Sequence, residues 1–137
     1  MKIVLDASLA IAAFTREERT EAAQAIMREI ALHGAMAPSL WRLEVANVLR
    51  TLVIRGRASA EFADEVLRTL SAFSIAIDPE TDQRAWRETL VLSRDLGLTS
   101  YDAAYLELAI RREAKLATLD KPLAAAALRC GVEVWPS

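Results

Sequence analysis

The strongest constraint on the fold is an alternation of short apolar segments with longer segments of helical periodicity. The apolar segments are predicted strands, at 2–6, 35–37, 74–77, 116–119 and 132–134. The intervals predict helices at 8–14, 17–34, 38–54, 59–72, 79–96, 99–109 and 121–130. Strands that are apolar on both faces and separated by helices are typical of a parallel sheet covered on both sides. We therefore expect an α/β fold, a three-layer α/β/α sandwich around a parallel sheet of about five strands.

Length and composition bound the size of the protein and its expected location. The 137 residues are expected to form one domain, 1–137, with one hydrophobic core. No apolar run approaches the roughly 18 residues that a membrane span needs, and Lys2 and Asp6 do not fit a signal peptide. The single cysteine, Cys130, excludes an intramolecular disulfide and a cysteine-rich zinc site. A cytoplasmic protein without a membrane partner is expected.

The charge of the chain does not by itself indicate a nucleic-acid-binding protein. The formal net charge is −2, although basic residues gather locally in two clusters. These clusters are Arg50, Arg55 and Arg57, and Arg111, Arg112 and Lys115. Such clusters are usually just solvated faces, so they permit a polyanionic partner without establishing one.

Three acidic residues lie near predicted ends of strands and helices. Asp6 ends the first strand and Asp120 follows the fourth, and ligands of parallel sheets bind beyond the carboxyl ends of the strands. Each of the two also fits the N-cap of the following helix. Asp102 lies three residues after Thr99, which is the spacing of a capping box. For these three acids, capping and a functional role both remain open.

Glu44 has no such structural explanation in the sequence. It is expected several residues inside the helix 38–54, where it shares a face with Asn47 near an apolar stripe. A carboxylate turned inward is costly unless it is paired or bound to a cation. Arg50 does not lie at the right helical spacing to pair with it.

A divalent cation would explain why acids gather at one edge of the sheet. Carboxylates that converge without a positive charge repel one another and shift their protonation. Mg²⁺ and Mn²⁺ prefer oxygen ligands, whereas zinc is a poor candidate because the chain has one histidine and one cysteine. Two such ions about 4 Å apart can activate a water for in-line attack at phosphorus. The lone His33, just before Gly34, is then not needed as a base.

Four stretches together resemble a known family. They are MKIVLDAS, APSLWRLEVANVL, LTSYDAAYLELA and LATLDKPL, in this order and spacing over almost the whole chain. In these stretches the sequence resembles PIN-domain ribonucleases, and in particular the VapC toxins of bacterial toxin–antitoxin pairs. The resemblance implies that the catalytic, metal-binding acids are Asp6, Glu44, Asp102 and Asp120. It also implies supporting polar groups at Ser8, Asn47, Ser100 and Thr118.

The resemblance further implies an activity and partners. It implies a PIN-like five-stranded parallel sheet and an endoribonuclease that depends on Mg²⁺ or Mn²⁺. It implies a homodimer, an RNA substrate and inhibition by a cognate antitoxin protein. Candidate RNA contacts are Arg50, Arg55 and Arg57. A groove for an amphipathic antitoxin helix could be lined by Trp41, Leu49, Leu52, Leu67, Leu70 and Phe73, although these side chains equally suit the core.

Three alternatives are weighed against the nuclease. A phosphoryl receiver domain needs a phosphorylated Asp after its central strand, and AMAPS offers none. Phosphatases with a nucleophilic Asp-x-Asp after the first strand need a second Asp, where this chain has Ser8. A non-catalytic PIN-fold binding or regulatory module would have no reason to keep four costly inward acids.

Overall fold

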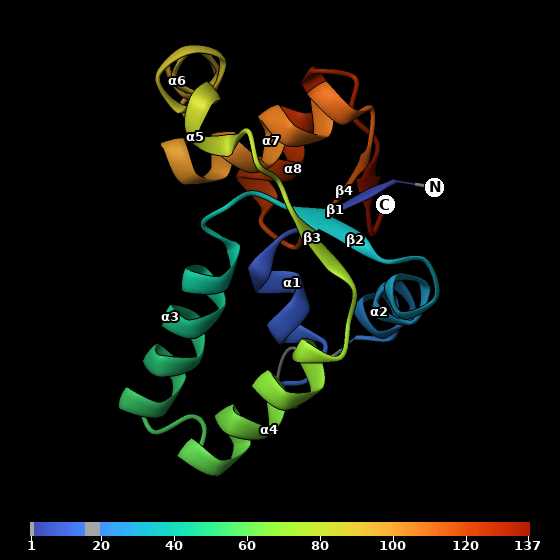
Figure 1. Ribbon diagram of the computed structural model, residues 1–137, viewed down its shortest axis with the longest axis vertical. Helices are drawn as coiled ribbons and strands as arrows, with labels where there is room; N and C mark the ends of the chain where they lie inside the picture. The colour runs from blue at the N-terminus through green and yellow to red at the C-terminus, as the bar shows by residue number, and fades with distance from the viewer. Residues whose placement is uncertain (1, 16–19) are drawn as a thin grey trace.

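The computed structural model describes residues 2–15 and 20–137 (Figure 1). Within these residues, five parallel strands form one sheet in the order β3-β2-β1-β4-β5. The strands are β1 (Ile3–Leu5), β2 (Ala35–Ala37), β3 (Ile75–Ile77), β4 (Lys115–Ala117) and β5 (Val134–Trp135). The predicted α/β fold with a parallel five-stranded sheet is confirmed.

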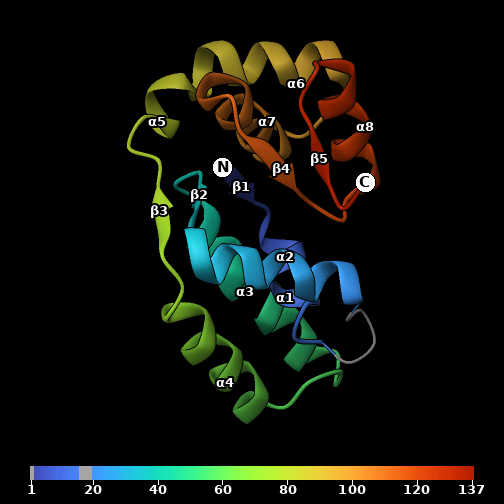
Figure 2. The ribbon, with the colours of Figure 1, turned by 90° about the vertical axis from the view of Figure 1, so that its right-hand side faces the viewer.

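Helices cover both faces of the sheet, as Figures 1 and 2 show. On one side lie α1 (Ala7–Ala12), α2 (Glu21–His33), α3 (Trp41–Ile54) and α4 (Ala60–Ser71). On the other lie α5 (Thr81–Arg84), the π-helical turn η1 (Ala85–Thr89), α6 (Leu90–Leu96), α7 (Ser100–Arg112) and α8 (Lys121–Arg129). The helices α3 and α4 extend away from the sheet as an antiparallel pair.

The strand order reverses direction between β1 and β4. From β1 the chain builds the sheet outward through β2 and β3, then returns to add β4 on the other side of β1. The register pairs Leu5 with Ala117, so both strands end at the same level. Such a reversal opens a crevice beyond the carboxyl ends of the strands. The residues that follow, Asp6 and Thr118, therefore meet at this crevice.

The hydrophobic core lies on both sides of β1 and β4. Their side chains Val4, Leu5 and Leu116 have no exposed surface. The helix α7 packs against both strands and buries every residue from 103 to 109. Among the described helices, none is both long and apolar enough to cross a membrane.

The helix predicted at 38–54 begins at Trp41, later than expected, because Ser39 bonds elsewhere. Its backbone N–H donates to Oγ1 of Thr81, and its hydroxyl donates to Oδ1 of Asp82. Ser39 thus links β2 to α5 instead of capping α3, whose N-cap Leu40 makes no side-chain bond.

Other boundaries also differ from the sequence expectation. The single helix predicted at 79–96 is divided into α5, η1 and α6. The extra residue of the π turn changes which side chains face the core, so Thr89 is buried while Trp86 is 90% exposed. The helix predicted at 99–109 continues to Arg112, and β5 begins two residues later and ends one residue later than the strand predicted at 132–134. The predicted start of the helix 17–34 falls outside the described residues.

Candidate metal centre at the sheet edge

Asp6 lies directly after β1 and has two roles. Its extended backbone makes it the N-cap of α1, and its Oδ1 accepts a weak bond from the Ser8 N–H at 3.4 Å. Its Oδ2 accepts bonds from the hydroxyls of Ser8 at 2.9 Å and Thr118 at 2.7 Å. The side chain is buried, so these donors hold one carboxylate in a fixed orientation at the crevice.

Thr118 joins Asp6 to Asp120. Besides donating to Asp6, its hydroxyl accepts a 3.0 Å bond from the backbone N–H of Asp120. Asp120 is the N-cap of α8, and its Oδ1 accepts from the Leu123 N–H at 2.9 Å. Because this bond engages Oδ1, Oδ2 of Asp120 is the oxygen left to act as a ligand. The expected capping role is confirmed.

Asp102 lies in the first turn of α7, where Thr99 is the N-cap. The Thr99 hydroxyl accepts from the Asp102 N–H at 3.1 Å. In the described part of the chain, the Thr99 N–H donates no hydrogen bond to the Asp102 carboxylate, so the capping box is only half formed. The carboxylate is half-buried and is not needed for the cap, which leaves it available to a ligand.

Glu44 is the fourth residue of α3 and lies in its first turn, nearer the helix start than expected, but among the described residues it makes no capping bond. It lies nearer the start because α3 begins only at Trp41. An acid in a first turn gains from the helix dipole. The hydrogen-bond partner of Glu44 lies on another helix: the hydroxyl of Tyr105 on α7 donates to Glu44 Oε1. The side chain is therefore half-buried and held from outside its own helix.

The environment of these acids opposes their ionisation. Burial raises the pKa of Asp6, and the charge of Asp120 raises it further, although Thr118 and Ser8 hydrogen bonds act in the opposite direction. Burial also raises the pKa of Glu44, again with a contribution from the charges of Asp6 and Asp102.

The neighbouring acids also affect the pKa values of Asp102 and Tyr105. Burial and then the charges of Asp120 and Asp6 raise the pKa of Asp102. Burial and the charges of Asp6 and Glu44 raise the pKa of Tyr105 far above its usual range, so its phenol stays a donor. The negative charges of the four acids therefore act on one another, and a bound cation would reduce their mutual repulsion.

The acids are neighbours without forming a closed ligand shell. Within residues 2–15 and 20–137, no three acidic, histidine or cysteine side chains converge closely enough to enclose an ion as they stand. Oxygens of Asp6, Glu44 and Asp120 accept hydrogen bonds from hydroxyl or backbone donors. The donor set of carboxylate and hydroxyl oxygens suits a hard divalent cation that keeps several waters.

The predicted supporting groups divide into two pairs. Ser8 and Thr118 bind Asp6, as described above. Asn47 and Ser100 are exposed, and among the described residues their side chains make no hydrogen bond to an acid. The candidate RNA contacts Arg50, Arg55 and Arg57 are exposed on and after the second half of α3, away from Glu44 in its first turn.

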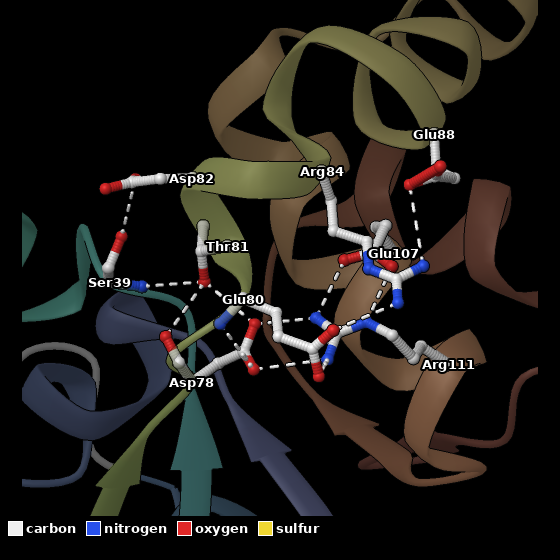
Figure 3. Close-up of polar contacts among 9 residues, drawn as sticks. All are labelled: Ser39, Asp78, Glu80, Thr81, Asp82, Arg84, Glu88, Glu107 and Arg111. Carbon is white, nitrogen blue, oxygen red and sulfur yellow. Dashed lines mark hydrogen bonds and ion pairs between the residues drawn. The ribbon is translucent and has the colours of Figure 1, made fainter.

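Arg111 belongs to a buried ion network rather than to a basic surface (Figure 3). Its guanidinium reaches Oδ2 of Asp78 at 2.6 Å and Oε2 of Glu107 at 2.9 Å, and only 12% of its side chain is exposed. The reading of Arg111, Arg112 and Lys115 as one solvated basic cluster is therefore wrong. Lys115 is likewise engaged, with Glu133 at 2.7 Å and over the ring of Trp135.

This network ties the end of β3 to α7. Asp78 directly follows β3 and accepts from Arg111 and from the hydroxyl of Thr81. Burial acts to raise the pKa of Asp78, but these hydrogen bonds outweigh it and hold the pKa below its ordinary value. Sequence reasoning missed this network, although the four-residue spacing of Glu107 and Arg111 was a signal for the pair on α7.

Comparison with known proteins agrees with this geometry. The PIN domain family matches residues 3–128. Ribonuclease VapC3 of Pyrobaculum aerophilum is 36% identical over 125 residues, which cover 90% of this chain and 93% of the relative. The crystal structure of PAE2754 from Pyrobaculum aerophilum superposes with a TM-score of 0.70 at 26% identity, covering 98% of this chain and 83% of that one. VapBC2 from Rickettsia felis gives a TM-score of 0.66 at 15% identity, covering 98% and 97%. This chain belongs to the PIN-domain family, among the relatives of VapC ribonucleases.

Proposed function

We propose that this protein is an endoribonuclease that depends on Mg²⁺ or Mn²⁺ and acts as the toxin of a toxin–antitoxin pair. The observation that carries the proposal is the shared site of Asp6, Glu44, Asp102 and Asp120, in which burial and mutual charge raise the pKa of the first three. Two of the four follow strands and two lie in first turns of helices, so rigid elements hold all of them. The relative named Ribonuclease VapC3 supports RNA as the substrate.

The residues fit a divalent cation held at the carboxyl ends of β1 and β4. Asp6, Glu44 and Asp102 would be its main ligands, and the free Oδ2 of Asp120 would bind directly or through water. A cation bound there would activate a water and neutralise charge at the phosphodiester. Ser8 and Thr118 hold Asp6 in place, so its carboxylate does not have to reorganise when the ion binds.

Cleavage assays with purified chain test the activity. Structured RNA with Mg²⁺ or Mn²⁺ should be cleaved by the parent, and cleavage should be lost with EDTA and in Asp6→Ala and Asp102→Ala. Asp64→Ala, which removes an exposed acid of α4, is the matched control and should cleave like the parent. Metal-independent cleavage, or active Asp6→Ala and Asp102→Ala variants, would contradict the mechanism. RNA binding without any cleavage would favour the non-catalytic module instead.

The antitoxin is proposed to bind between α3 and α4. A cavity of about 250 Å³ there is lined by six apolar side chains together with Arg42 and Ser71. Four residues from the predicted groove line it, namely Trp41, Leu67, Leu70 and Phe73. Leu49 does not line this cavity and lies in the core at 2% exposed, while Trp41 and Leu70 line the cavity and also belong to the core. Leu67→Asp, at a position that is 41% exposed, should weaken capture of the co-expressed antitoxin while the free chain still folds.

A homodimer is proposed from the same family relationship. Exposed apolar side chains at Trp86, Val91 and Ile110 support it, because they lie on and beside the η1–α6 segment. The last two residues also line a cavity of about 600 Å³ against α7. Sedimentation velocity should give a dimer for the parent and a smaller species for Trp86→Ser. A monomeric parent at micromolar concentration would contradict this proposal.

A further inference from the structure

Tyr105 combines complete burial with a bond to an acid of another helix. Its side chain has no exposed surface, and it packs with Leu106 and Leu108 in the middle of the core. Its hydroxyl donates to Glu44 Oε1, although the two residues are 61 positions apart. If this position had only to fill the core, phenylalanine would suffice, and its side chain needs no hydrogen-bond partner.

The bond connects the two helices that carry proposed ligands. Tyr105 lies three residues after Asp102 on α7, so the two share a helix face. Glu44 lies in the first turn of α3 and, within the described residues, receives its side-chain hydrogen bond from Tyr105. The phenol ring is fixed by the core, so its oxygen is a rigid point of attachment. The other oxygen of Glu44, Oε2, is left for a different partner.

We propose that Tyr105 is a positioning residue for the metal centre: its hydroxyl holds Oε1 of Glu44 so that Oε2 is presented to the cation beside Asp102. This inference rests on the metal site of the proposed function and adds a residue that is not itself a ligand. The helix α3 reaches the core through Trp41, Val45 and Leu49, but none of these contacts fixes the carboxylate of Glu44. The hydroxyl of Tyr105 supplies that restraint.

Tyr105→Phe isolates the hydroxyl, because the ring that fills the core is kept. Tyr101→Phe is the matched control, since it makes the same change on the same helix at a side chain that is 65% exposed. Thermal unfolding in EDTA should show that both variants remain folded. Any difference in metal binding between them then reports the contacts of the Tyr105 hydroxyl, with Glu44 and with the backbone of Ala7, and not the loss of a hydroxyl in general.

Mn²⁺ binding to the full chain, measured by titration calorimetry, is the test. Tyr105→Phe should bind Mn²⁺ about tenfold more weakly than the parent, as is usual when a group orienting a metal ligand is removed. Tyr101→Phe should match the parent. In a Glu44→Gln background, Tyr105→Phe should have no further effect, because the carboxylate that it positions is gone.

The outcomes separate this inference from the function on which it rests. If the parent fails to bind Mn²⁺, the metal site fails and the role of Tyr105 fails with it. If the parent binds and Tyr105→Phe binds equally well or more tightly, only the positioning role is overturned. A loss of affinity that persists in full in the Glu44→Gln background would assign the effect to packing, and would also overturn it.

Discussion

The hydroxyl of Thr118 donates a 2.7 Å hydrogen bond to Oδ2 of Asp6, joining residues that are 112 positions apart. The bond spans the neighbouring strands β1 and β4 at the point where the strand order reverses. Since the same hydroxyl accepts from the Asp120 N–H, one side chain sets the spacing of two proposed ligands. Thr118 is 2% exposed, so solvent cannot replace either bond.

Thr118→Val should therefore impair both stability and activity. Valine keeps the shape but removes the donor to Asp6 and the acceptor for Asp120, which should cost about 1–3 kcal/mol of unfolding free energy. Metal-dependent cleavage should fall about tenfold because the ligands lose their orientation. Urea denaturation and cleavage rates measure the two effects. Thr118→Ser keeps the hydroxyl and should recover most of both, and a Thr118→Ser as impaired as Thr118→Val would refute the role of the bond.

Asp78→Asn should be strongly destabilising. It leaves the guanidinium of Arg111 with a weakened partner in a site where the two side chains are only 12% and 2% exposed. Loss of one partner from a buried ion pair should cost about 3 kcal/mol of unfolding free energy, measured by urea denaturation. Adding Arg111→Met should deepen the loss, because it leaves the carboxylate of Glu107, whose side chain is only 6% exposed, without its partner.

A more exposed ion pair, between α5 and η1, provides the comparison. Arg84 pairs with Glu88 at 3.5 Å, but the two side chains are 34% and 48% exposed. Glu88→Gln should therefore change stability far less than Asp78→Asn. Equal losses in the two variants would show that the network in Figure 3 does not stabilise the fold through its burial.

The sequence sufficed for features that depend on neighbours along the chain. The alternation of apolar and helical segments predicted the parallel sheet, and the acids Asp6 and Asp120 were placed at strand ends because a strand and its following N-cap are local signals. The expected capping role of Asp120 is confirmed, and its charge acts on Asp102, while its role as a metal ligand stays a prediction.

Features that depend on contacts between residues far apart in the sequence could not be predicted from local patterns. Nothing near Arg111 in the sequence indicates that its guanidinium meets Asp78, which precedes it by 33 positions. The sequence predicts Ser39 near a helix start, but its backbone N–H and hydroxyl donate to Thr81 and Asp82 instead of capping α3. Glu44 was singled out as an inward acid without a capping role, but its place in the first turn depends on where α3 begins, which the sequence did not indicate. The inward orientation of its carboxylate depends on Tyr105.

The metal-free protein should lose stability as the pH rises. The folded-state pKa of Asp6, Glu44 and Asp102 lies above the ordinary values of 3.8 and 4.5. Above those values the native chain still holds protons that the unfolded chain has released, so the unfolding free energy falls until the raised pKa values are passed. Asp78 acts oppositely, and its contribution is lost only below 3.8, as the pH falls through its lowered pKa.

Unfolding in EDTA at a series of pH values measures this slope. Asp102→Asn removes one titrating acid, so the decline above about pH 4 should become shallower. A slope that is unchanged in Asp102→Asn would show that its carboxyl titrates normally in the folded protein.

Divalent metal should reverse the rank order of the parent and Asp102→Asn. In EDTA at pH 7, the variant should melt a few degrees above the parent, because it lacks one of several acids that repel one another without a cation. With Mn²⁺ at a hundred times its dissociation constant, the parent should gain about 2.7 kcal/mol, whereas the variant has lost a ligand and gains less. Its melting temperature should then lie below that of the parent. Asp95→Asn, at an exposed acid of α6, should follow the parent in both conditions. If Mn²⁺ raised the melting temperatures of the parent and Asp102→Asn equally, Asp102 would not be a ligand, and its raised pKa would reflect burial alone.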